Sequence, residues 1–149
     1  MHLLTEHPEQ RQIWLADLDG VTPTAIEEIV RWASPVIFMR RTLSVDAVLG
    51  GHAMRAGNKV AMFHWAANRD PAQFADPDVF DVRRAPNHHV GFGGPGPHFC
   101  LDAHLARREM TVMFRELPTR APNVHATAAP RRLQSMFING TKALPVEMR

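Results

Sequence analysis

The spacing of hydrophobic residues predicts two helices at the start of the chain. Residues 6–17 read as a short helix closed by Leu-Asp-Gly. Thr22 before Pro23 is typical of a helix start, with Thr as the N-cap and Pro in the first turn, although Thr24 and Glu27 also fit a capping box. This second helix ends at Ser34-Pro35. Its apolar face comprises Ile26, Ile29, Val30 and Ala33.

After Pro35 the apolar spacing shortens to that of strands. The candidate strands are residues 36–42, 44–49, 52–54 and 59–65, with turns at Gly50-Gly51 and at residues 56–58. Residues 68–98 are irregular and rich in Pro, Asp and Asn. A loop of that length is uncommon unless it is functional.

The most regular helical pattern covers residues 101–117 and is expected to stop at Pro118. Residues 133–146 read as a hairpin around Asn139-Gly140. The chain is therefore expected to be α+β, mainly α, with helices and small sheets segregated. The long helix is expected to bury one stripe, made of Ala103, Ala106, Met110, Met113 and Leu117.

Composition narrows the class of protein. The chain has 149 residues, of which 45% are hydrophobic and 21% charged, as in a soluble single domain. The net charge of +2 and the scattered Lys and Arg argue against a nucleic-acid partner. No apolar run reaches the roughly 20 residues needed to span a bilayer, and the first residues do not resemble a signal peptide. We therefore expect a cytoplasmic protein.

The strongest chemical signal is the segment Phe92–Asp102, which reads FGGPGPHFCLD. Its glycines permit positive φ or a close approach of the backbone to a flat ligand, and its prolines stiffen the loop. Cys100, the single cysteine of the chain, follows at the start of the long helix. Free N–H groups and the helix dipole favour a thiolate there. Such a thiolate suits haem iron as an axial ligand, although a Gly/Pro-rich loop before a helix is often plain turn chemistry.

This segment, with the following HLARREM, resembles the cysteine-ligand loop and helix of the cytochromes P450. Glu28-Ile29-Val30-Arg31 resembles the Glu-x-x-Arg helix of that family, and residues 68–71 and 74–77 resemble its meander. The resemblance covers nearly all the chain in the family's order. It implies that residues 1–149 are the C-terminal, haem-binding portion of the fold, with the Glu-x-x-Arg helix, small β-sheet, meander, cysteine loop, long helix and C-terminal hairpin.

The resemblance also implies roles for single residues. Cys100 is the iron ligand of haem b and carries the only direct chemistry in this portion. Arg41 and His98 bind a haem propionate, and Glu28 and Arg31 form a buried structural pair. The loop residues packed near the sulfur and porphyrin are Phe92, Gly93, Gly94 and Gly96. The residues facing an apolar substrate pocket are Val36, Ile37, Phe38, Met39, Met136 and Phe137.

The implied activity is a monooxygenase reaction that inserts one atom of O2 into a C–H bond. Electrons would come from NAD(P)H through a ferredoxin or similar donor. The substrate would be an apolar small molecule, and the details of the loop and tail resemble actinobacterial members that act on sterol side chains or fatty acyl chains. Arg107 and Arg108 are candidates for the partner's docking face, or are simply solvated.

Three positions depart from the family pattern. Phe92 lies eight residues before Cys100, one more than the commonest spacing, and Asp102 occupies a position that is usually Gly. Val79 lies where the meander normally supplies an Arg or His to the Glu-Arg pair, so Arg83 or Arg84 would have to replace it. The family's N-terminal part and its oxygen-activating central helix would precede Met1. The chain is therefore expected to be incomplete and inactive by itself.

Two other functions remain open at this point. One is a non-enzymatic haem-binding remnant. The other is a transition-metal site, since a soft sulfur and imidazoles suit copper or zinc. Its ligands would be His88, His89, His98 and Cys100.

Overall fold

The computed structural model describes residues 1–148 and begins with three helices: α1 (His2–Glu6), α2 (Pro8–Ala16) and α3 (Leu18–Ala33). The helix predicted over 6–17 is α2, which begins later because Pro8 occupies its first position, whereas residue 6 ends the separate helix α1. The prediction that the next helix starts at Thr22-Pro23 was wrong. It starts at Leu18, where the Asp17 side chain accepts the Gly20 N–H at 2.9 Å, and Pro23 lies within it.

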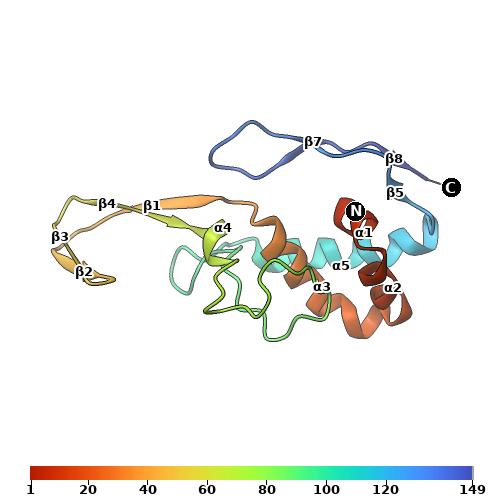
Figure 1. The fold of residues 1–149 in the computed structure, drawn as a ribbon, viewed down its shortest axis with the longest axis horizontal. Helices are drawn as coiled ribbons and strands as arrows, with labels where there is room; N and C mark the ends of the chain where they lie inside the picture. The colour runs from red at the N-terminus through yellow and green to blue at the C-terminus, as the bar shows by residue number, and fades with distance from the viewer. Residues whose placement is uncertain (149) are drawn as a thin grey trace.

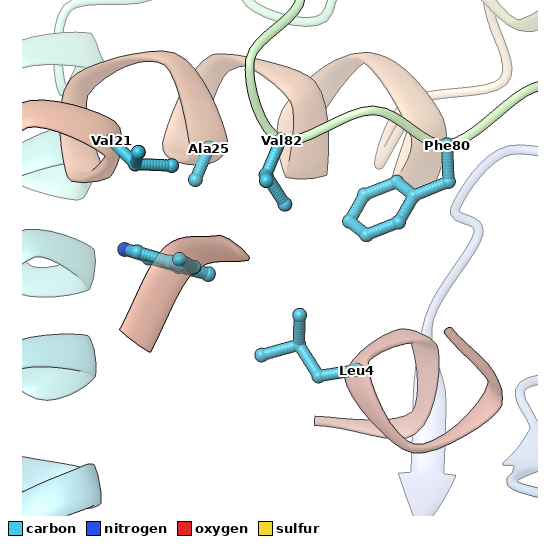
Figure 2. Packing of buried hydrophobic residues seen from close by; sticks show 6 residues of the cluster. Leu4, Val21, Ala25, Phe80 and Val82 are labelled. Carbon is cyan, nitrogen blue, oxygen red and sulfur yellow. The ribbon is translucent and has the colours of Figure 1, made fainter. Parts of the chain in front are cut away.

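The three helices enclose the main hydrophobic core, which also recruits the irregular segment after α4. Figure 2 shows Val21 and Ala25 of α3 side by side with Val82 and Phe80 of the loop, and Leu4 of α1 on the opposite side of the cluster. These side chains are at most 5% exposed. Burial of Val21 in this core explains why α3 extends beyond the predicted start.

The strand region contains two antiparallel ladders, as the pattern predicted, with shorter strands. β1 (Phe38–Thr42) pairs with β4 (Lys59–Phe63), and β2 (Ala47–Leu49) pairs with β3 (His52–Met54). Residues 64 and 65, expected in the last strand, begin the short helix α4 (His64–Ala67). In Figure 1 the two ladders form an arm that extends away from the helices, and β1 connects this arm to the end of α3.

The long helix α5 runs from Ala103 to Arg120, so Pro118 does not stop it. Pro118 instead lines an apolar pocket together with Trp14 and Val124. The predicted buried stripe was only partly right. Ala103 is fully buried, Ala106, Met110 and Leu117 are half-buried, and Met113 is 56% exposed, because α5 packs on α3 along one part of its surface only.

The tail forms two short antiparallel ladders, β5 (His125–Ala126) with β8 (Val146–Glu147) and β6 (Arg131–Arg132) with β7 (Thr141–Ala143). The predicted hairpin exists, but Asn139-Gly140 lies on its returning arm instead of at its turn. Asn139 is used elsewhere: its side chain donates to the Ala33 carbonyl at 2.6 Å and its N–H to Pro35 at 2.9 Å. These bonds attach the tail to the end of α3.

Between α4 and α5 the chain has no regular element within the described residues. Figure 1 shows this yellow-green to cyan segment looping beside α3 and α4 before it enters α5. Among residues 1–148, no helix is long and apolar enough to cross a membrane.

Candidate functional site

A buried ion pair joins α3 to the irregular segment. Glu28 and Arg31 are both 0% exposed, and the guanidinium donates to both carboxylate oxygens, at 2.7 and 2.8 Å. Arg31 also donates to backbone carbonyls of Asn68 and Pro77 at 2.8 Å and of Val79 at 3.2 Å. A bidentate pair with further bonds is the geometry in which a buried charge is tolerated.

The carboxylate of Glu28 has further donors from the same segment. They are the Asp81 N–H at 3.1 Å, the Asn87 amide at 3.1 Å and the Arg84 guanidinium, whose Nε lies 3.2 Å from Oε2. Arg84 thus provides Glu28 with the second cation that the family pattern places at the position of Val79. Arg83 has no such contact with Glu28 among the described residues; its N–H bonds the Asp81 side chain. This network fixes the path of the chain toward the cysteine loop.

The cysteine loop is closed by one backbone bond, in which the Cys100 N–H donates to the Phe92 carbonyl at 3.0 Å. Gly93 and Gly96 have φ of 90° and 135°, conformations that side chains rarely adopt. Gly91 is needed for a different reason: a Cβ there would lie 2.5 Å from the side chain of Val30. The loop therefore lies directly against α3 and returns to Cys100, which is half-buried.

Cys100 borders a cavity of about 700 Å³ between the loop and the β1–β4 arm. Its walls are mostly apolar side chains and the backbone of residues 90–98. Within the described part of the chain, no Asp or Glu lines it, whereas Arg41, His64 and His98 do. The cavity thus combines a thiol, apolar walls and basic groups.

His64 is a site residue that the sequence reasoning missed. Its side chain is 9% exposed, it lines the cavity, and its Nδ1 is buried without a hydrogen-bond partner in the described structure. Burial lowers the pKa of His64, and the charge of Arg41 lowers it further. The sequence did not indicate a role for His64, because it is a single His beside Trp65 at the end of a strand. Only the turn into α4 directs its side chain to the cavity.

The other predicted site residues lie at different depths around the cavity. Arg41 is exposed, and within residues 1–148 its guanidinium donates to the carbonyl of its neighbour Arg40. His98 is exposed, and Phe92 is half-buried. Gly93, Gly94 and Gly96 form the cavity edge with them. The structure brings all of these to the same cavity as Cys100.

The predicted substrate-facing stretches meet, but mostly outside this cavity. The Ile37 N–H donates to the Phe137 carbonyl at 2.9 Å, and the rings of Phe38 and Phe137 are 6.3 Å apart. Of the six expected pocket residues, all within residues 1–148, Val36 and Met39 line the cavity. Met136 is 79% exposed.

A second charged cluster lies beside the loop. Arg107 of α5 donates to both oxygens of Glu27, at 2.6 and 2.8 Å, and His89 Nε2 lies 2.9 Å from the same carboxylate. Arg107 is thus paired and half-buried, whereas Arg108 is exposed. A docking role for Arg107 is not supported, because its guanidinium is already bound.

This cluster predicts an acid-sensitive contribution to stability. Burial alone would raise the pKa of Glu27, but hydrogen bonds from Arg107 and His89 outweigh it and lower that pKa to about 2, from 4.5. The unfolded chain therefore takes up the proton first as the pH falls below about 4.5, and the stabilisation is lost toward pH 2. In urea unfolding, the stability difference between wild type and Glu27→Gln should be constant above about pH 5.5 and shrink below about pH 4.5. The exposed Glu116→Gln is the control, and a difference that does not change with pH would contradict the assignment.

The alternative metal site is contradicted. Across residues 1–148, no three His, Cys, Asp or Glu side chains are grouped closely enough to hold a metal ion. His89 is engaged on both nitrogens, since its Nδ1 accepts the Gly91 N–H at 3.0 Å.

Comparison with known families settles which fold this is. The family model for cytochrome P450 matches residues 15–117, more than half of the chain. The chain belongs to the cytochrome P450 family.

Two proteins similar to this P450 chain are named as a lipid hydroxylase and a steroid monooxygenase. It is 58% identical over 143 residues to a methyl-branched lipid omega-hydroxylase of Mycobacterium tuberculosis, covering 96% of this chain and 33% of that protein. It is 39% identical to a steroid C26-monooxygenase of Rhodococcus jostii, covering 100% and 31%. The chain thus spans about a third of these relatives.

Solved structures agree on the fold. A Mycobacterium marinum cytochrome P450 in complex with pseudoionone superposes with a TM-score of 0.93 at 45% identity, covering 96% of this chain and 34% of that one. A P450 in complex with a fatty acid on an acyl carrier protein gives 0.93 at 36% identity, covering 99% and 38%. The mixed fold of helices and small sheets is therefore part of the P450 fold, as predicted.

Proposed function

We propose that this chain is the C-terminal, haem-binding portion of a cytoplasmic haem-thiolate monooxygenase. The observation that carries the proposal is the cavity at Cys100, where a single thiol faces apolar walls and basic groups. Haem b fits this set, because it is a flat apolar ring with an iron that binds thiolate and with two carboxylates. The orphaned Nδ1 of His64, the free face of Arg41 and the exposed His98 are suitable partners for those carboxylates.

In this proposal each residue of the cavity has one task. Cys100 holds the iron, Arg41, His98 and His64 hold the propionates, and Phe92 limits the access of water to the sulfur. The Glu28–Arg31 network keeps the loop in place and does no chemistry. When bound, the haem supplies the reductive activation of O2.

The reaction proposed converts a C–H bond to C–OH, with one oxygen atom entering the product and the other leaving as water. Two protons and two electrons balance it, the electrons coming from NAD(P)H through a ferredoxin or similar donor. The substrate class is a methyl-branched lipid or a sterol, on the strength of the relatives' names. Both names specify oxidation at one defined carbon of a largely apolar molecule, and the cavity walls are apolar as such a substrate needs.

The chain alone is expected to give no hydroxylated product. Its structure leaves large apolar side chains in contact with water, with Leu101 93%, Val48 72% and Met136 79% exposed. In the proposed full-length protein these side chains would contact further parts of the fold. The cavity also has no acidic side chain to relay protons within the described residues.

The test compares the chain with a fusion protein in which it replaces the matching third of the Mycobacterium tuberculosis relative. Each is supplied with haem, ferredoxin, its reductase and NADH, and hydroxylation of a methyl-branched lipid and a sterol is followed. The fusion protein should form product coupled to NADH consumption, and its Cys100→Ala variant should not. Product from the chain alone would contradict the expectation that it is inactive by itself. No product from a haem-loaded fusion protein would favour a non-enzymatic haem-binding remnant.

A further inference from the structure

We propose that Glu27, His89 and Arg107 form a brace that positions Phe92 beside the Cys100 loop, and so controls the surroundings of the thiolate. The three are positioning residues, because none of them lines the cavity. This inference rests on the proposed function, since it assigns the brace a role toward the haem ligand.

The brace connects three separate parts of the chain. Glu27 comes from α3, His89 from the irregular segment and Arg107 from the second turn of α5, directly after the cysteine loop. The side chains are 26%, 3% and 31% exposed, so the ion pair is largely shielded from solvent. A bidentate, charge-assisted contact of this kind fixes orientation as well as distance.

The hydrogen bonds also fix the state of His89. Its Nδ1 accepts the Gly91 N–H at 3.0 Å, so the ring hydrogen is on Nε2 and is donated to Glu27 at 2.9 Å. The imidazole is thereby held in one orientation between the backbone of the loop and α3. Gly91 is the residue directly before Phe92.

Two of the three brace residues, Arg107 and His89, contact the ring of Phe92. The Arg107 guanidinium carbon lies 4.5 Å from the centre of the ring, and the His89 ring centre lies 5.9 Å from it. The carbonyl of the same residue accepts the Cys100 N–H at 3.0 Å. Phe92 therefore connects the brace, through its side chain, with the loop closure, through its backbone.

Electrostatics agree with this placement. Hydrogen bonds to Glu27 raise the pKa of Arg107 most, and the charge of Cys100 raises it further. The guanidinium thus lies within electrostatic reach of the sulfur. By comparison, Arg31 donates to backbone carbonyls of residues 68–79. Glu28 accepts from Asp81, Arg84 and Asn87, so that network, within the described residues, ends before Gly91 and does not touch Phe92.

The test uses Arg107→Lys in the haem-loaded fusion protein. Lysine keeps the charge but loses the planar fork that binds Glu27 and stacks on Phe92. The rate at which the ferrous carbon monoxide complex loses its red-shifted thiolate band should rise about tenfold, as for other partners that orient a metal ligand. The control, Arg108→Lys, changes the exposed neighbour on the same helix and should leave the rate unchanged.

A second background separates positioning from general stability. In Phe92→Leu the stacking surface is gone, so Arg107→Lys should add little to the rate of band loss. Equal effects in both backgrounds would overturn the proposal, as would band loss that only follows global unfolding in urea. Glu27→Gln serves as a second variant, because it retains the shape of the side chain. If both Arg107→Lys and Glu27→Gln failed to fold, the brace would be a structural ion pair only and the proposal would be wrong. If the unmodified fusion protein binds haem without the thiolate band, the proposed function itself fails and the brace has no ligand to position.

Discussion

Replacing Cys100 with alanine is expected to abolish the red-shifted band of the ferrous carbon monoxide complex in the fusion protein. That band depends on a thiolate ligand, and this chain has one cysteine, at the edge of the cavity. Haem content should also fall, because removing the axial ligand leaves only the propionate contacts and apolar packing. The measurement is the reduced carbon monoxide difference spectrum together with the haem-to-protein ratio.

His104→Ala is the matched control for this experiment. His104 is an exposed potential ligand in the first turn of α5, four residues after Cys100. Its loss should change neither the band nor the haem content. If the alanine variant of Cys100 kept the band, the assignment of the ligand would be wrong.

Glu28→Ala is expected to reduce the free energy of unfolding by roughly 3–5 kcal/mol, because it leaves the Arg31 guanidinium buried without its counter-charge. Arg84 and Asn87 lose an acceptor at the same time. Typical domain stability is only about 5–15 kcal/mol, so the variant should yield little folded, haem-loaded protein. Urea unfolding and the yield of haem-loaded protein measure the effect.

An exposed Glu–Arg pair on a helix gives the control. Glu116 and Arg120 are one helical turn apart at 2.8 Å, but their side chains are 55% and 78% exposed. Glu116→Ala should cost only about 0.3–0.5 kcal/mol, since water screens the pair. Similar losses in the two variants would mean that burial does not decide the value of the Glu28–Arg31 contact.

Local chemistry in the sequence was sufficient for several elements. The Gly-rich loop before a regular helical pattern predicted the cysteine loop and α5, and two of its glycines have the positive φ that only Gly adopts easily. Strands with turns at Gly50-Gly51 and at residues 56–58 were found close to their predicted places. The start of α3 was predicted too late, because the N-cap at Asp17 was overlooked and because the burial of Val21 extends the helix ahead of Pro23.

The sequence by itself determined the family, the identity of the candidate ligand and the presence of a Glu-Arg pair, because those depend on residue types at short, fixed spacings. Only the tertiary structure decided which groups surround them. Arg84 replaces the missing partner at Val79, His64 turns into the cavity, and Arg107 binds Glu27 from 80 residues away. Such contacts depend on how α3, the irregular segment and α5 pack together, and no periodicity along the chain encodes that packing.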